Sequence, residues 1–118
     1  MRFSLLLWAL SWMLKHAARK NEAFRKYIRT ADVRVLIRTA DARHARLFRF
    51  NKGRFSSCSG DTKDFDVALV WKDAKTGFSV MTSKSKDASF NAAAEGNLRV
   101  EGMSLYAQWF EDGVKLVT

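Results

Sequence analysis

The chain has 118 residues, 47% of them hydrophobic and 13% aromatic, and its formal net charge is +9. This apolar content excludes a disordered chain, and the length leaves room for a single core, so we expect one domain over residues 1–118. One cysteine, Cys58, excludes an intramolecular disulfide and favours a reducing compartment. The two histidines, His16 and His44, have no second ligand at metal spacing, so we expect neither a metal site nor a cofactor.

The positive charge lies in the first half of the chain. Residues 1–54 contain 14 Lys and Arg against 3 Asp and Glu, a net +11, whereas residues 55–118 contain 7 against 9, a net −2. This asymmetry predicts one basic face, of the kind that attracts anionic membranes or nucleic acids. The sequence lacks zinc ligands, an evident helix-turn-helix and the glycine-aromatic signature of an RNA-stacking sheet, which makes nucleic acid the less favoured partner.

Residues 1–30 are predicted to form a basic amphipathic helix. Apolar residues recur there at spacings of three and four, at Phe3, Leu6, Leu7, Leu10, Met13, Leu14, Ala17 and Ala18. Asn21 is expected to bend or divide the helix, because its side chain competes for backbone groups. The apolar run is shorter than the ~20 residues that span a membrane. No small-residue cleavage site follows it, so we favour a retained helix over a secretory signal.

The beginning of this helix is apolar on more than one side. Trp8 and Trp12 are four residues apart and share a side, and tryptophan is favoured at membrane interfaces. Two interpretations remain open: the apolar residues pack only into the core, or a surplus face contacts a membrane, a second protomer in a homodimer, or another protein. For membrane contact we expect Leu6, Trp8, Trp12, Lys15 and Arg19.

Residues 32–59 predict a three-stranded antiparallel meander, with strands over 32–39, 44–50 and 54–59. Val33, Val35 and Ile37 alternate with a mostly polar set, and a glycine at position 53 suits a hairpin loop. The third strand is short and polar, as an edge strand is. Four arginines are expected to line the open face, either as a solvated surface or as a phosphate-binding one: Arg34, Arg38, Arg46 and Arg49.

Residues 65–71 are apolar on both faces, which predicts a strand inside the sheet. Asp73 is a candidate N-cap for a helix over 74–82, and Ser83 or Ser85 for a second, alanine-rich helix that ends at Gly96. A strand over 97–101 follows. A strand–helix–strand connection predicts that the strands at 65–71 and 97–101 pair in parallel.

The order of elements over residues 65–110 resembles the C-terminal half of the sterol-carrier-protein family. A buried strand and two helices lead to a strand between Gly96 and Gly102, and an amphipathic helix with Leu105, Tyr106, Trp109 and Phe110 closes the segment. Met103 stands where family members usually carry an acidic residue. The resemblance implies an α+β fold, in which helices cover a five-stranded mixed sheet and an apolar tunnel lies between the two layers.

The resemblance also implies a non-catalytic carrier of an apolar, lipid-like ligand, such as an acyl lipid, an isoprenoid quinone intermediate or a sterol-like molecule. Bacterial relatives include accessory factors of ubiquinone biosynthesis. The tunnel walls are then expected at Leu69, Phe78, Met81, Phe90, Val100, Met103, Leu105, Trp109 and Phe110. The carrier would be cytoplasmic and peripheral on the inner face of an anionic membrane.

Two alternatives come from other functional classes. The basic first half leaves open a nucleic-acid-binding or protein-interaction module. An enzyme is disfavoured, because no nucleophile–base pair, carboxylate dyad or phosphate-binding glycine loop is recognisable in the sequence. The chain ends in Leu-Val-Thr rather than in the peroxisomal Ser-Lys-Leu address, which favours the cytoplasm over the peroxisome.

Overall fold

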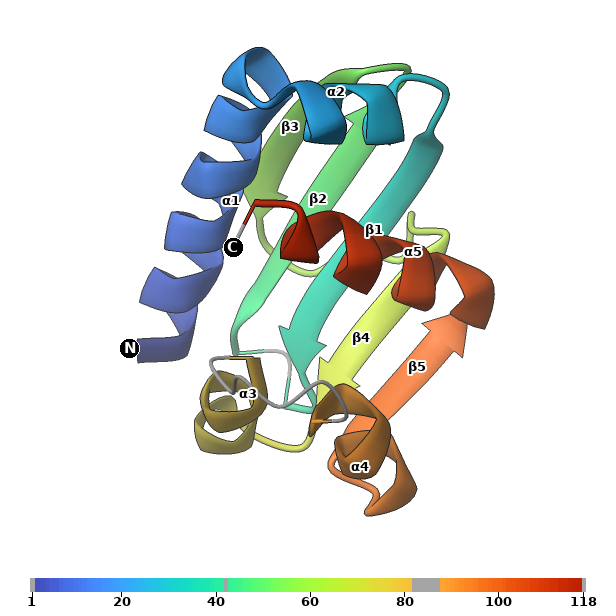
Figure 1. Cartoon of the computed structure of the whole chain (residues 1–118). Helices are drawn as coiled ribbons and strands as arrows, with labels where there is room; N and C mark the ends of the chain where they lie inside the picture. Colours follow the sequence, from blue (N-terminus) through green and yellow to red (C-terminus); the bar gives the residue numbers. More distant parts are fainter. Residues whose placement is uncertain (1, 42, 82–87, 118) are drawn as a thin grey trace.

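Helices cover one face of a five-stranded sheet in the computed structural model, which describes residues 2–41, 43–81 and 88–117 (Figure 1). The strand order is β3-β2-β1-β4-β5. The strands are β1 (Asp32–Thr39), β2 (Ala45–Asn51), β3 (Arg54–Ser59), β4 (Val67–Trp71) and β5 (Leu98–Gly102). The helices are α1 (Arg2–Lys20), α2 (Glu22–Ile28), α3 (Ala74–Met81), α4 (Ala88–Ala94) and α5 (Ser104–Lys115). This arrangement confirms the predicted α+β class.

Asn21 divides the N-terminal helix, as its sequence predicts. It is the N-cap of α2, and its side-chain oxygen accepts the backbone N–H of Phe24 at 3.1 Å. Such a bond satisfies one of the donors left free at a helix start. The division lets α1 run along the sheet while α2 turns across its upper end (Figure 1). No helix among the described residues is both long enough and apolar enough to cross a membrane.

The face of the sheet beneath the helices holds the main core. Val33, Val35 and Ile37 of β1 are buried on this face, and Val35 lies opposite Phe48 of the antiparallel strand β2. On its other side β1 pairs in parallel with β4, whose five residues are all buried. The prediction of an interior strand, apolar on both faces, is therefore confirmed.

The predicted parallel pairing of the strands around residues 65–71 and 97–101 is wrong. β4 and β5 pair antiparallel, with Leu69 opposite Val100. Both α3 and α4 lie at the end of the sheet where β4 finishes, so the chain re-enters the sheet from that same end (Figure 1). A parallel pairing requires the connection to return along the full strand length, and α3, at eight residues, is only about 12 Å long. The parallel pair is instead β1 with β4.

The second face of the sheet is covered in part by the segment that leads from β3 to β4. Phe65 of this segment packs against a small cluster of Leu36, Ala68 and Val70, all of them buried. Carboxylates of this segment form ion pairs with two arginines of β1. Arg34 forms ion pairs with Asp64 and Asp66, and Arg38 pairs with Asp61 at 3.8 Å and with Glu101 of β5 at 3.5 Å.

The predicted ladder of four arginines on one open face is therefore wrong. Arg34 and Arg38 have their charges paired with carboxylates. Arg46 lies on the helix-covered face, because it is two residues from Phe48 and therefore points to the same side of β2. Its guanidinium donates to the hydroxyl of Ser57, which in turn donates to Ser11 of α1. Arg49 remains exposed. The exposed cations of the first half that take part in no ion pair among the described residues therefore lie both on the helices and around the β2–β3 hairpin, at Arg49, Lys52 and Arg54.

Candidate functional site

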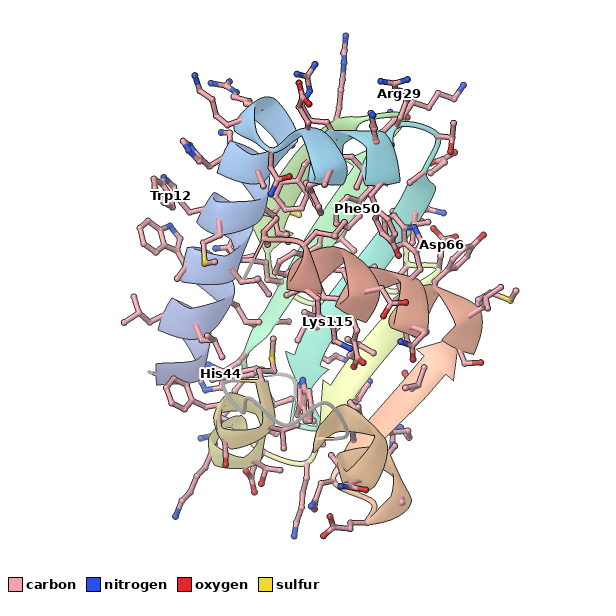
Figure 2. All side chains as sticks on the ribbon, in the orientation of Figure 1. Trp12, Arg29, His44, Phe50, Asp66 and Lys115 are labelled. Atoms are coloured by element: carbon pink, nitrogen blue, oxygen red, sulfur yellow. The ribbon has the colours of Figure 1, made fainter. Side chains whose placement is uncertain are left out.

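Aromatic rings fill the space between α5 and the middle of the sheet. The ring of Phe110, on the buried side of α5, lies 5.6 Å from Phe48 and 6.1 Å from Phe50. Phe50 also contacts Trp109 edge-on at 5.0 Å and Phe55 at 5.1 Å. Phe50 lies between α2 and α5 in Figure 2. This part of the interface between helices and sheet is packed core.

Helix α2 joins the same cluster through Tyr27. Its ring stacks on Trp109 at 5.3 Å, and its hydroxyl donates to the Trp109 carbonyl at 2.7 Å. Burial raises the pKa of Tyr27, and the charge of Asp112 adds to this effect. Gly113 of α5 makes the close approach possible, since a Cβ there would come within 3.0 Å of the tyrosine ring.

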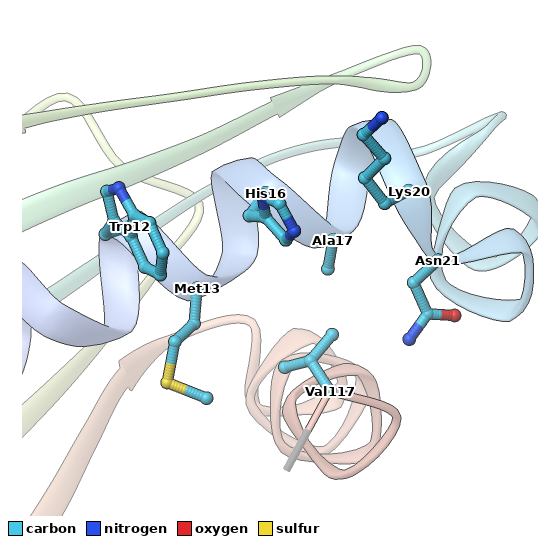
Figure 3. Close-up of a pocket in the computed structure, with 7 residues that line it drawn as sticks. All are labelled: Trp12, Met13, His16, Ala17, Lys20, Asn21 and Val117. Atoms are coloured by element: carbon cyan, nitrogen blue, oxygen red, sulfur yellow. The ribbon is translucent and has the colours of Figure 1, made fainter.

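A hollow of about 410 Å³ lies between α1 and the C-terminal end of the described chain (Figure 3). It is a shallow groove largely open to solvent rather than an enclosed cavity. Ala17 lies in its wall, and Val117 faces the helix from the other side. The C-terminal end is held there because Asn21 donates a hydrogen bond to the Leu116 carbonyl at 3.1 Å. The lining residues are Trp12, Met13, His16, Ala17, Lys20, Asn21 and Val117.

The outer side of α1 carries an apolar stripe that leads into a basic end. Leu5 is 64% exposed, Trp8 55% and Trp12 59%, and Trp12 projects away from the sheet in Figure 2. Lys15 and Arg19 are exposed further along the helix. The opposite side of α1 is buried core at Phe3, Leu7, Leu10 and Leu14.

Four of the five residues predicted for membrane contact are exposed: Trp8, Trp12, Lys15 and Arg19. Leu6 is not, because it packs against the core. Leu5 takes its place, and the sequence analysis missed it. Positions 5, 8 and 12 are separated by three and four residues, and that spacing places Leu5 on the tryptophan side of the helix.

The nine residues predicted to line the tunnel fall into three groups. Six lie in or against the main core between helices and sheet: Leu69, Phe78, Met81, Val100, Trp109 and Phe110. Met103 and Leu105 do not join them, since they are 57% and 74% exposed. Both lie at the start of α5, whose buried residues are Ala107, Phe110 and Gly113. Phe90 belongs to α4, but its side chain lies outside the described part of the structure, as do the predicted caps Ser83 and Ser85.

The structure brings together one nucleophile–base pair that the sequence analysis missed. The hydroxyl of Ser4 lies 2.6 Å from Nδ1 of His44, forty positions away, and no local signal marks the pairing. A serine of this type needs a third group to orient its histidine. The nearby Asp41 instead accepts from Thr39 and from the backbone of Arg43. The contact fixes the start of α1 to the β1–β2 turn.

The arrangement of this sheet and its helices is similar to known structures. A structure described as the UbiJ-SCP2 ubiquinone synthesis protein matches with a TM-score of 0.73 at 14% identity, over 97% of this chain and 96% of that one. The chain has the sterol-carrier-protein fold. Sterol carrier protein 2 from Yarrowia lipolytica, in its apo form, matches with a TM-score of 0.63 at 15% identity, over 91% and 88% of the two chains.

The same fold also occurs as part of a larger protein. A stereoselective inverting alkylsulfatase from a Pseudomonas species matches with a TM-score of 0.55 at 11% identity. The match covers 79% of this chain but only 14% of the sulfatase. No protein-family model matches the sequence, and no curated protein does.

Proposed function

We propose that this protein binds and carries an apolar, lipid-like molecule and does not catalyse a reaction. The observation that carries the proposal is the sterol-carrier fold, matched end to end by a ubiquinone synthesis protein and by sterol carrier protein 2. The candidates are an acyl lipid, an isoprenoid quinone intermediate and a sterol-like molecule. Binding is driven by removal of hydrocarbon from water, at roughly 25 cal/mol per Å² of apolar surface.

The ligand is proposed to lie between the sheet and the helices at the α3 end of the interface. Leu69 of β4 and Val100 of β5 lie opposite each other there, and Phe78 and Met81 of α3 pack on the same core. The α5 end of the interface is occupied by the aromatic cluster around Phe50. Methionine suits such a wall because its flexible chain repacks around ligands of different shape.

We also propose that α1 docks the carrier on anionic membranes. Its exposed side combines an apolar stripe of Leu5, Trp8 and Trp12 with the cations Lys15 and Arg19. Amphipathic helices of this composition lie at the boundary between headgroups and acyl chains. Nucleic-acid binding is less well supported, because two of the four arginines predicted to line the open face, Arg34 and Arg38, are paired with carboxylates. A homodimer through α1 is disfavoured by repulsion between two such basic helices.

The carrier proposal is tested by native mass spectrometry of the purified protein, followed by solvent extraction and lipid analysis. We expect a copurifying lipid, or uptake of a fluorescent fatty acid or quinone analogue. Met81→Glu should strongly reduce uptake, because a charge in an apolar site is costly. Met103→Glu makes the same change on an exposed residue and should leave uptake unaltered. A folded protein that holds no lipid and takes up neither analogue contradicts the proposal.

A further inference from the structure

The hollow beside α1 changes from apolar to polar along the helix axis. Two rows of side chains line it, each with members four residues apart, so that each row follows one side of the helix (Figure 3). The rows are Trp12, His16 and Lys20, and Met13, Ala17 and Asn21. The distance along the axis from the first to the last member is about 12 Å. One end of the hollow is thus formed by a tryptophan and a methionine, and the other by a lysine and an amide.

The polar end offers one cation. Lys20 is exposed, and among the ion pairs of the described residues it takes part in none. The amide of Asn21 is occupied, because its oxygen accepts from Phe24 and its nitrogen donates to the Leu116 carbonyl. In the middle, the ring of His16 stacks on the ring of Trp12, with their centroids 5.6 Å apart and an interplanar angle of 11°. Recognition of a charged group at this end therefore falls to Lys20.

We propose that the hollow binds a single-chain amphiphile with an anionic head, its chain against Trp12, Met13 and Val117 and its carboxylate or phosphate beside Lys20. The proposal rests on the carrier function and deepens it by naming a ligand class and a residue that selects the head. Charge complementarity favours an anionic head group, because a cationic one would be repelled by Lys20 and by Arg19 on the same helix. The C-terminal end of α1 carries the negative end of the helix dipole, which repels an anion. Binding of the anionic head therefore depends on the positive charge of Lys20.

The position of the hollow also indicates where the amphiphile comes from. Trp12 belongs both to the hollow and to the exposed stripe with Leu5 and Trp8. If α1 lies on a membrane, Trp12 brings the apolar end of the hollow against the membrane surface. The hollow is thus a loading site on the surface, separate from the interface beneath α3.

Head selectivity is tested by calorimetric titration of the full chain with decanoate, decyl phosphate, decanol and decyltrimethylammonium, each below its critical micelle concentration. The two anions should bind about fivefold more tightly than decanol, as expected for a partly exposed charge pair. Lys20→Gln should remove this preference, Lys20→Arg should keep it, and Lys20→Glu should transfer it to the cationic amphiphile. Lys26→Gln makes the same change of charge at an exposed position of α2 and should alter nothing. A preference for either anion over the other supports the proposal and identifies the head.

The location is tested by filling the hollow. Met13→Trp should weaken binding of decanoate and decanol alike by tenfold or more, whereas Met103→Trp, on the exposed start of α5, should not. Lys20 also stabilises the last turn of α1, so the Tm of each variant is measured; fraying of the helix would weaken decanol binding as much as decanoate binding.

If neither anion binds better than decanol, or if anion binding is insensitive to Lys20→Gln and Met13→Trp, this inference is overturned and the carrier proposal stands. If no amphiphile binds and no lipid copurifies, both proposals fail.

Discussion

Glycine is required at position 102, where β5 passes closest to the segment before β4. Its φ of +86° is a left-handed conformation, and a Cβ there would collide with the backbone carbonyl oxygen of Asp66. The same carbonyl accepts the N–H of Met103 at 3.0 Å, which ties the start of α5 to β4. Met103, which stands where sterol carrier proteins usually have an acidic residue, therefore lies in a turn held by this backbone hydrogen bond.

Gly102→Ala should lower the free energy of unfolding by about 2–3 kcal/mol, through backbone strain together with the collision. Gly96→Ala is the matched control, because Gly96 has a φ of +80° and a Cβ added there would meet no atom within 4 Å. It should cost only about 1 kcal/mol. Urea denaturation of both variants measures the difference, and equal losses would show that the collision with Asp66 has no effect.

Asp73 makes the start of α3 sensitive to acid. Its carboxylate accepts the backbone N–H of Thr76 at 2.7 Å, and this bond lowers the pKa of Asp73 below its ordinary 3.8. Since the folded pKa is the lower one, the cap stabilises the fold fully above pH 3.8, and this contribution is lost as pH falls through the folded pKa.

The stability difference between the wild type and Asp73→Ala should therefore shrink as pH falls below that value. Asp73→Asn retains a capping oxygen that does not titrate, so its advantage over the alanine variant should persist in acid. Thermal melts of the three proteins from pH 7 to pH 2.5 provide the comparison. A constant gap between wild type and Asp73→Ala would be inconsistent with a charged cap.

Helix α1 has two apolar sides with different roles. One side is core, with Phe3, Leu7 and Leu14 almost fully buried. The other bears the exposed stripe of Leu5, Trp8 and Trp12. Deletion of the helix would remove both sides and unfold the protein, so point substitutions on the exposed stripe are needed to test docking separately from folding.

Replacing Leu5, Trp8 and Trp12 together by serine should reduce binding to anionic liposomes at least tenfold, because each side chain contributes on the order of 1 kcal/mol of hydrocarbon burial. The Tm should change little. Co-sedimentation at increasing salt should show that the wild type retains a salt-resistant fraction that the triple variant lacks, since screening acts only on the charges. Leu105→Ser, at the exposed start of α5, is the control.

A wild-type protein that does not bind anionic liposomes at low salt, but binds DNA or RNA near physiological salt, would favour a nucleic-acid interface instead. Nucleic-acid binding should be insensitive to the triple serine variant, because it depends on cations rather than on apolar contacts.

On the scale of the whole molecule, Phe50 connects the sheet to two helices. Its ring contacts Phe24 of α2 at 6.4 Å and both Trp109 and Phe110 of α5. The first half of the chain supplies β2 and α2, and the second half supplies α5. The aromatic cluster therefore joins the two halves across the covered face of the sheet.

Phe50→Ala should reduce the free energy of unfolding by about 3–5 kcal/mol, as large core deletions do. Far-UV circular dichroism and tryptophan fluorescence should still report a single, coincident transition, because both halves share this core. Phe65→Ala removes a partly buried ring on the opposite face, over the small Leu36 cluster, and should cost markedly less. Two separate transitions in Phe50→Ala would contradict a shared core.

Most helices and strands, and the side of each that is buried, could be predicted from the amino-acid sequence alone. Periods of two and of three to four residues identified the strands and helices, and Asn21, Asp73 and Gly96 marked boundaries that the structure confirms. These features are local, because each depends on side chains within a few positions of one another. The apolar order over residues 65–110 was sufficient to identify the fold by resemblance.

How distant segments contact one another could not be predicted from the sequence and is seen only in the tertiary structure. The β4–β5 direction depends on where α3 and α4 return the chain, and the pairing of Arg38 with Asp61 and Glu101 joins residues far apart in sequence. The exposure of Met103 and Leu105 and the hollow between α1 and Val117 arise in the same way. Periodicity records which side of an element is apolar, whereas what covers that side depends on segments elsewhere in the chain.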